Sequence, residues 1–165
     1  MELFHYIERG GLIVYLLIAL NIIGYSIMVW KALLLLLATK KREQTALKLL
    51  ATARRGQTDE HHIDAAVALE VKRMEFGLNT VKIIASIAPL LGLLGTVIGV
   101  LSSFDAISTS GLGDPAIFSG GISVALITTV TGLIVSIPHY IGYNYITGML
   151  DGYELKLLHT VRVQA

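Results

Sequence analysis

The chain has 165 residues, of which 54% are hydrophobic and only 15% are charged, and its formal net charge is +1. A water-soluble domain of this length needs many more charged residues to cover its surface, so this composition excludes an ordinary soluble protein. The sequence has no cysteine, which excludes a disulfide framework and a thiolate metal site. Its length corresponds to about one domain, and we expect residues 1–165 to form one.

The first apolar segment covers residues 10–30 and contains no charged residue. A hydrocarbon layer about 30 Å thick needs roughly 20 apolar helical residues, so we predict a membrane span over about residues 11–30. The preceding residues carry Glu2, Glu8 and Arg9 rather than a basic start, and the apolar run is too long for the core of a signal peptide. We therefore expect this segment to be retained.

The segment from residue 31 to residue 82 holds ten of the thirteen Lys and Arg residues, whereas the only charges in residues 105–119 are Asp105 and Asp114. Basic residues favour the cytoplasmic side of a membrane. We therefore expect a cytoplasmic segment 31–82, a periplasmic loop 105–119 and a periplasmic N-terminus. The ten basic residues are Lys31, Lys40, Lys41, Arg42, Lys48, Arg54, Arg55, Lys72, Arg73 and Lys82.

Both cytoplasmic segments show the apolar spacing of helices, and in residues 62–80 the positions at this spacing are Ile63, Val67, Val71, Met74 and Leu78. Residues 62–80 are predicted to form a helix that leads almost directly into the next span, because residues 62–76 contain no Pro or Gly. Residues 54–60 are the clearest break in the first segment. In the cytoplasmic tail, residues 143–165, one helical face is predicted to carry Leu150, Tyr153, Leu157, Leu158 and Val161.

The second predicted span covers about residues 83–104 and contains Gly92, Gly95 and Gly99. Small residues let helix backbones approach closely in lipid, so these glycines predict helix packing. The packing can lie within one subunit or between subunits. Pro89 removes a backbone hydrogen bond and predicts a kink, serving either packing or motion.

The third predicted span covers about residues 120–142 and carries a cluster of hydroxyl side chains. Thr128 and Thr129 point about 100° apart on a helix, so both cannot face one point equally. Hydroxyls that face a pore can hold water and exchange protons, although a membrane threonine often bonds only to its own turn. Pro138 predicts a second kink.

The interiors of the second and third spans contain no Asp, Glu, Lys or Arg. Intramembrane proton carriers usually depend on an Asp, Glu or His. His139 is the only candidate besides the tyrosines, and we expect it near the cytoplasmic end, in an interfacial position. If protons cross here, another chain must supply the main acid. No catalytic, phosphate-loop or metal motif is visible, so we expect no enzyme activity, no cofactor, no metal and no nucleic-acid partner.

Two segments in this order resemble the pore motifs of the ExbB/TolQ branch of the MotA/TolQ/ExbB proton-channel family. They are residues 89–99, PLLGLLGTVIG, and residues 121–138, GISVALITTVTGLIVSIP, with Tyr143 and Asn144 fitting as well. The likeness covers about residues 88–144, and the predicted topology extends it. It implies an all-α membrane protein with three transmembrane helices and cytoplasmic helical extensions.

The resemblance also implies an assembly and a mechanism. The family suggests a homopentamer in the bacterial inner membrane around a dimer of an ExbD/TolR-type single-span partner, with a TonB- or TolA-type protein beyond. The partner's membrane Asp would carry the proton, and Thr96 and Thr129 match pore-facing threonines. Thr128 is a further candidate for the proton pathway. One departure is Val124, where many ExbB and TolQ chains carry Glu.

Two other functions remain open for such a chain. A flagellar-stator subunit of the MotA type is longer and has four spans, which disfavours that alternative. A passive helical scaffold that assembles a partner without conducting protons is distinguished by proton flux. A secondary transporter is disfavoured because three spans offer no inverted repeat.

Overall fold

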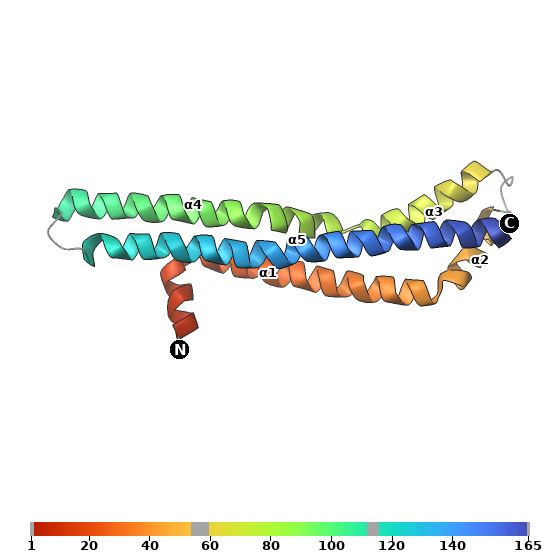
Figure 1. Ribbon diagram of the computed structural model, residues 1–165, viewed down its shortest axis with the longest axis horizontal. Coiled ribbons are helices and arrows are strands. Elements are labelled where there is room, and N and C mark those ends of the chain that lie inside the picture. The colour runs from red at the N-terminus through yellow and green to blue at the C-terminus, as the bar shows by residue number, and fades with distance from the viewer. Residues whose placement is uncertain (1, 54–59, 112–115, 165) are drawn as a thin grey trace. The chain divides into compact units, whose positions relative to one another are not determined.

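The computed structural model describes residues 2–53, 60–111 and 116–164, and these residues form five helices without a strand. The helices are α1 (Glu2–Lys40), α2 (Arg42–Ala53), α3 (Glu60–Glu75), α4 (Leu78–Ser110) and α5 (Ala116–Gln164) (Figure 1). Three of them, α1, α4 and α5, are long and apolar enough to cross a membrane. The prediction of an all-α protein with three membrane helices is therefore confirmed.

Helix α1 changes direction at Gly11, where φ is 63° and ψ is −157°. Glycine adopts these angles at little cost because it has no Cβ atom. The turns of α1 before Gly11 leave the axis of the rest of the helix at a steep angle (Figure 1). Beyond residue 30 the helix continues to Lys40, so the predicted span is the central part of a longer helix.

The connection between α4 and α5 differs from the loop predicted over residues 105–119. Helix α4 continues past Asp105 to Ser110, and α5 begins at Ala116 instead of near Gly120. No Gly or Pro lies between Asp105 and Gly111, where φ reaches 78° and the backbone N–H donates to the carbonyl of Ile107 at 2.8 Å. A glycine in this conformation ends a helix. Asp114 lies outside the described residues.

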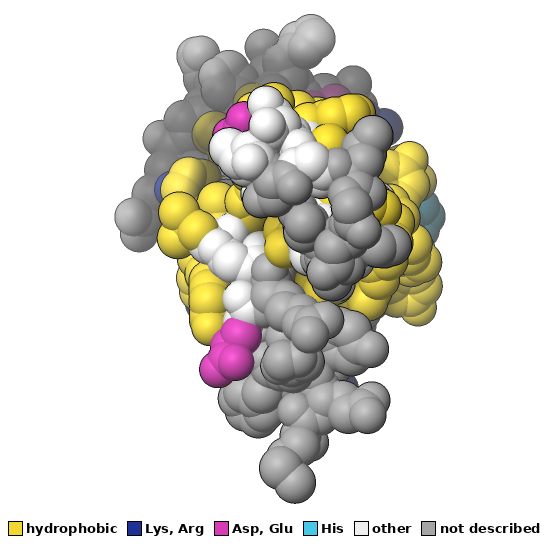
Figure 2. All heavy atoms as spheres, turned by 90° about the vertical axis from the view of Figure 1, so that its left-hand side faces the viewer, with side chains coloured by type: hydrophobic (Ala, Val, Ile, Leu, Met, Phe, Trp, Pro, Cys, Tyr) yellow, Lys and Arg dark blue, Asp and Glu magenta, His cyan; other side chains and the backbone are white. Residues whose placement is uncertain are grey.

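The chain divides into two compact units. Unit 1 comprises residues 1–25 and 80–141, and unit 2 comprises residues 26–79 and 142–165. In unit 1, α4 and α5 run side by side (Figure 1), and its core contains Leu17, Ile84, Ala88 and Val135. Figure 2 looks onto the end of this unit where α4 ends and α5 begins, and hydrophobic side chains dominate its flanks. Such flanks suit a lipid environment.

Unit 2 buries the helical faces that the sequence predicts. The predicted tail face is inside, with Leu150, Tyr153, Leu157 and Val161 each at most 3% exposed. From α3, the predicted positions Val67, Val71 and Met74 join the same core. Helix α3 ends at Glu75 and α4 begins at Leu78, so the direct connection expected at Gly77 is confirmed.

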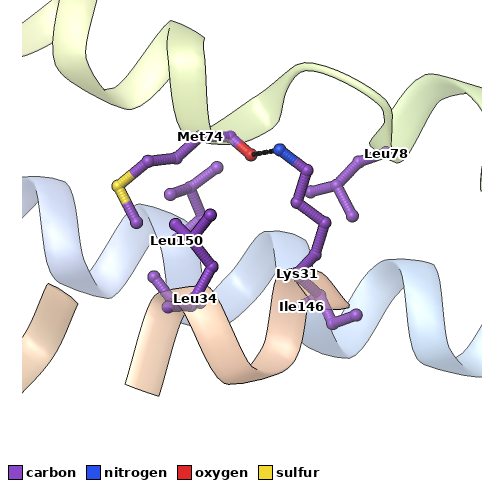
Figure 3. A pocket seen from close by; sticks show the side chains of 7 residues that line it. Lys31, Leu34, Met74, Leu78, Ile146 and Leu150 are labelled. Atoms are coloured by element: carbon purple, nitrogen blue, oxygen red, sulfur yellow. Dashed lines mark hydrogen bonds between the residues drawn. The ribbon is translucent and has the colours of Figure 1, made fainter. Parts of the chain in front are cut away.

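Lys31 closes this turn from inside unit 2. Its ammonium group donates a hydrogen bond of 3.0 Å to the carbonyl oxygen of Met74, one residue before the end of α3 (Figure 3). A cation at a helix C-terminus is favourable because the last carbonyls carry partial negative charge. Lys31 is only 6% exposed, with its stem among Leu34, Leu78 and Ile146. In the sequence, Lys31 is the first of the ten basic residues of the predicted cytoplasmic segment.

Candidate functional site

Helices α4 and α5 touch through glycine along one face of α4. A Cβ atom built on Gly92 would lie 2.9 Å from the carbonyl oxygen of Thr128, and one on Gly99 would lie 2.5 Å from that of Gly121. From the other side, a Cβ atom on Gly132 would lie 2.6 Å from the carbonyl oxygen of Ala88. All these distances are shorter than real Cβ contacts. The predicted glycines therefore lie at a backbone contact within one subunit.

Thr96 of α4 and Thr129 of α5 face each other across this contact. Their hydroxyls form a short hydrogen bond in which either oxygen can be the donor. The Thr96 hydroxyl also lies 3.2 Å from the carbonyl of Gly92 and 3.1 Å from that of Ala125. The Thr129 hydroxyl lies 3.4 Å from the same Gly92 carbonyl. The sequence places these residues 33 positions apart, and the fold makes them a pair.

The chemistry of this pair follows from its hydrogen count. Each hydroxyl has one hydrogen and two lone pairs. Thr96 can donate to a backbone carbonyl while Thr129 donates to Thr96, or Thr129 can donate to Gly92 while Thr96 donates to Thr129. The pair thus has two hydrogen-bond arrangements of opposite direction. Such a pair can accept from, or donate to, a third group that approaches it.

An apolar hollow on α4 begins at Thr96. It has a volume of about 330 Å³ and is otherwise lined by Val97, Val100, Leu101 and Phe104. Thr96 and Thr129 are both half-buried. The hydroxyl pair is therefore not sealed inside the subunit, and a neighbouring helix that filled the hollow would pass beside Thr96.

Thr128 occupies a different position from its neighbour in sequence. It is fully buried, and its hydroxyl donates to the carbonyls of Val124 at 3.0 Å and Ala125 at 2.9 Å on its own helix. It fills the space that Gly95 leaves open. Thr131 likewise donates to its own turn, at Ile127. Because Thr128 and Thr129 point about 100° apart, Thr128 packs against Gly95 at the helix contact and Thr129 bonds to Thr96.

Two serines, Ser103 and Ser136, bridge the same helices. Ser136 donates to the carbonyl of Ala85, and Ser103 donates to the carbonyl of Phe118 at 3.0 Å. Both serines are buried. A signal for the serines exists in the sequence, because each is a small polar residue in an apolar run.

Pro89 and Pro138 lie within α4 and α5, and each helix continues through its proline.

His139 is enclosed within unit 1, and its position near the cytoplasmic end of the span stays a prediction. Its exposed fraction is 0%, its Nδ1 lies 2.7 Å from the carbonyl of Val135, and its Nε2 has no hydrogen-bond partner among the described residues. The ring lies against Gly24, which has no side chain, and meets the Tyr25 ring edge-on at 4.9 Å. A glycine on α1 makes the space for this imidazole, and single-helix reasoning does not reveal that.

The comparisons with known proteins point to one family. Residues 37–157 match the sequence model of the MotA/TolQ/ExbB proton channel family. A biopolymer transport protein ExbB homolog of Methanothermobacter thermautotrophicus is 44% identical over 92 residues, which are 56% of this chain and 32% of the relative. The biopolymer transport protein exbB1 of Vibrio cholerae is 36% identical over 59% of this chain and 44% of its own. The Tol-Pal system protein TolQ of Pseudomonas aeruginosa is 37% identical over 48% of this chain and 34% of its own. The chain thus spans less than half the length of each of these relatives.

Proposed function

This chain belongs to the MotA/TolQ/ExbB proton channel family, and we propose that it uses the proton motive force to energise envelope processes or outer-membrane transport through an ExbD/TolR-type partner. The protein is a multi-pass membrane protein with three membrane helices. The names of two relatives, in biopolymer transport and in the Tol-Pal system, support an energising role.

The hydroxyl pair of Thr96 and Thr129 carries the proposal. It is a hydrogen-bonding element in apolar helices, and it reaches a hollow on the surface of the subunit. We assign both threonines to the lining of a pore, in a homopentamer that surrounds a dimer of the single-span partner. Thr128 we assign to helix packing, because its hydroxyl is fully buried and bonded to its own turn.

The main titrating acid belongs to the partner in this mechanism. Residues 83–104 and 120–142 supply no carboxylate, and Val124 stands where many relatives have Glu. An ionised carboxylate that approached Thr96 and Thr129 would receive one hydrogen bond from the pair, because the other hydroxyl hydrogen is used in the bond between the two threonines. This bond favours the ionised form, and the two arrangements of the pair let it follow the acid as the acid gains and loses its proton.

We expect no useful proton conduction by this chain alone. A charge at the bilayer centre costs roughly 2.5–3.5 kcal/mol on the insertion scale, whereas a proton crossing 100 mV yields about 2.3 kcal/mol. The test uses liposomes with a pH-sensitive dye and compares the chain alone, with its partner, and with a partner whose membrane Asp is changed to Asn. We expect flux only with the unchanged partner. Rapid leak through the chain alone would contradict the mechanism, and a full complex without flux would support a passive scaffold.

The orientation that we propose puts the N-terminus in the periplasm and the C-terminus in the cytoplasm of the inner membrane. Since the chain has no cysteine, single cysteines report sidedness directly. Ser108→Cys and Ala51→Cys replace exposed residues at the end of α4 and in α2. We expect a membrane-impermeant maleimide to label Ser108→Cys in intact cells with a permeable outer membrane, and Ala51→Cys only after lysis. Labelling of both before lysis would reverse this topology.

A further inference from the structure

A basic hollow of about 340 Å³ lies on the surface of unit 2 and takes no part in the proton pathway. It is lined by Arg42, Leu155, Lys156, His159 and Thr160. Arg42 is the first residue of α2, and the other four residues belong to α5. The fold therefore brings basic side chains from two distant parts of the chain to one place, where no lining residue is acidic.

Three other basic residues of unit 2 have acidic partners. Lys72 pairs with Glu75 at 3.0 Å, and Arg162 pairs with Asp64 at 3.0 Å. Among the described residues, neither Arg42 nor Lys156 forms an ion pair. The charge of the hollow is therefore left for an anion from outside the subunit.

Arg42 provides a second, independent observation. Its Nε atom is buried and has no hydrogen-bond partner among the described residues. A buried donor without an acceptor is costly, so a turn of the Arg42 side chain that brought this N–H to an acceptor in the hollow would remove an energetic penalty. The Thr160 hydroxyl donates to the carbonyl of Lys156 at 2.8 Å, so its hydrogen is already in use. The cations, and not the hydroxyl, must hold the ligand.

We propose that this hollow binds a phosphate group, free in solution or part of a soluble phosphate ester. The guanidinium fork of Arg42 matches the oxygens of a phosphate, and Lys156 adds a second positive charge. The His159 imidazole supplies a further N–H donor. Leu155 is 70% exposed at the same place, where it can contact the organic part of a phosphate ester. Unit 2 thereby contains an anion-binding site, whereas the hydroxyl pair of Thr96 and Thr129 belongs to unit 1.

The test removes charge from the hollow in the assembled, full-length complex. Lys156→Gln with His159→Gln changes two exposed residues, and Arg42→Gln with Lys156→Gln also removes the buried donor. The control, Lys72→Gln with Arg73→Gln, removes two exposed charges from α3 in the same unit. One arm measures retention of phosphatidylglycerol over phosphatidylcholine by native mass spectrometry. The other measures thermal stabilisation by inorganic phosphate against chloride at equal ionic strength.

We expect the hollow variants to bind the phosphate probe roughly tenfold more weakly, since hydrogen bonds to charged groups are lost, while the control behaves as wild type. Loss in the second arm supports the proposal, whereas loss in the first arm alone assigns a lipid and overturns it. Equal behaviour of wild type and the Lys156→Gln, His159→Gln variant in both arms overturns the proposal. An equal loss in the control overturns it as well, because the effect would then come from overall charge.

Discussion

Replacing both Thr96 and Thr129 with valine is expected to abolish proton-driven work while the oligomer still assembles. Valine keeps the shape of threonine but removes the hydroxyl, so the hydrogen bond between the two helices disappears. The backbone carbonyls that these hydroxyls contact keep their helical hydrogen bonds. Assembly should therefore survive, with a melting temperature near that of the wild type.

The size of this functional effect follows from the hydrogen bond lost to the partner's acid. Removing hydroxyl support from a buried ionised group costs about 1–3 kcal/mol. Each 1.36 kcal/mol on a barrier is tenfold in rate, so proton flux should fall roughly 5- to 150-fold. The measurement is flux in liposomes that contain the complete complex, together with its mass by native mass spectrometry.

Thr131→Val is the matched control for the double change. Thr131 lies two residues after Thr129 and is also half-buried, but its hydroxyl donates to the carbonyl of Ile127 on its own helix. We expect normal flux from this variant. Normal flux from the Thr96→Val, Thr129→Val variant would reject the pore role of the hydroxyl pair, and a variant that failed to assemble would show that the pair is structural.

Gly99→Ala is expected to separate α4 from α5 and to destabilise the subunit. The added methyl group would lie 2.5 Å from the carbonyl oxygen of Gly121 and 2.8 Å from the backbone nitrogen of Ala125. Backbone atoms cannot rotate away, so the whole helix must shift. Overpacking of this kind typically costs about 1–3 kcal/mol, and we expect a melting temperature several degrees lower in detergent.

Gly120→Ala separates this steric effect from the loss of a glycine as such. Gly120 lies in the same unit on α5, and a Cβ atom there would meet nothing within 4 Å. Because alanine is the better helix former, its melting temperature should be unchanged or slightly raised. A Gly99→Ala protein as stable as wild type would show that the two helices are not in the close contact described above.

The sequence by itself determined the number of membrane helices and much of the core of unit 2. An uninterrupted apolar run suffices to predict each span, because roughly 20 apolar helical residues cross the hydrocarbon layer without placing a charged side chain in it. Apolar spacing suffices for Val67, Val71, Leu150 and Leu157, because a helical period assigns residues to a face without knowledge of the partner helix. The resemblance in the pore motifs also led directly to the family that the comparisons show.

Only the tertiary structure decided which residues of other helices a given side chain contacts. Thr128 and Thr129 are adjacent in sequence, yet one packs against Gly95 and the other bonds to Thr96, because the rotation of α5 about its axis is set by contact with α4. The burial of His139 depends on the absence of a side chain at Gly24, far away in the chain. The position of Lys31 depends on where the carbonyls of α3 end. Such choices arise from packing between helices, and the pattern within a single helix carries no information about them.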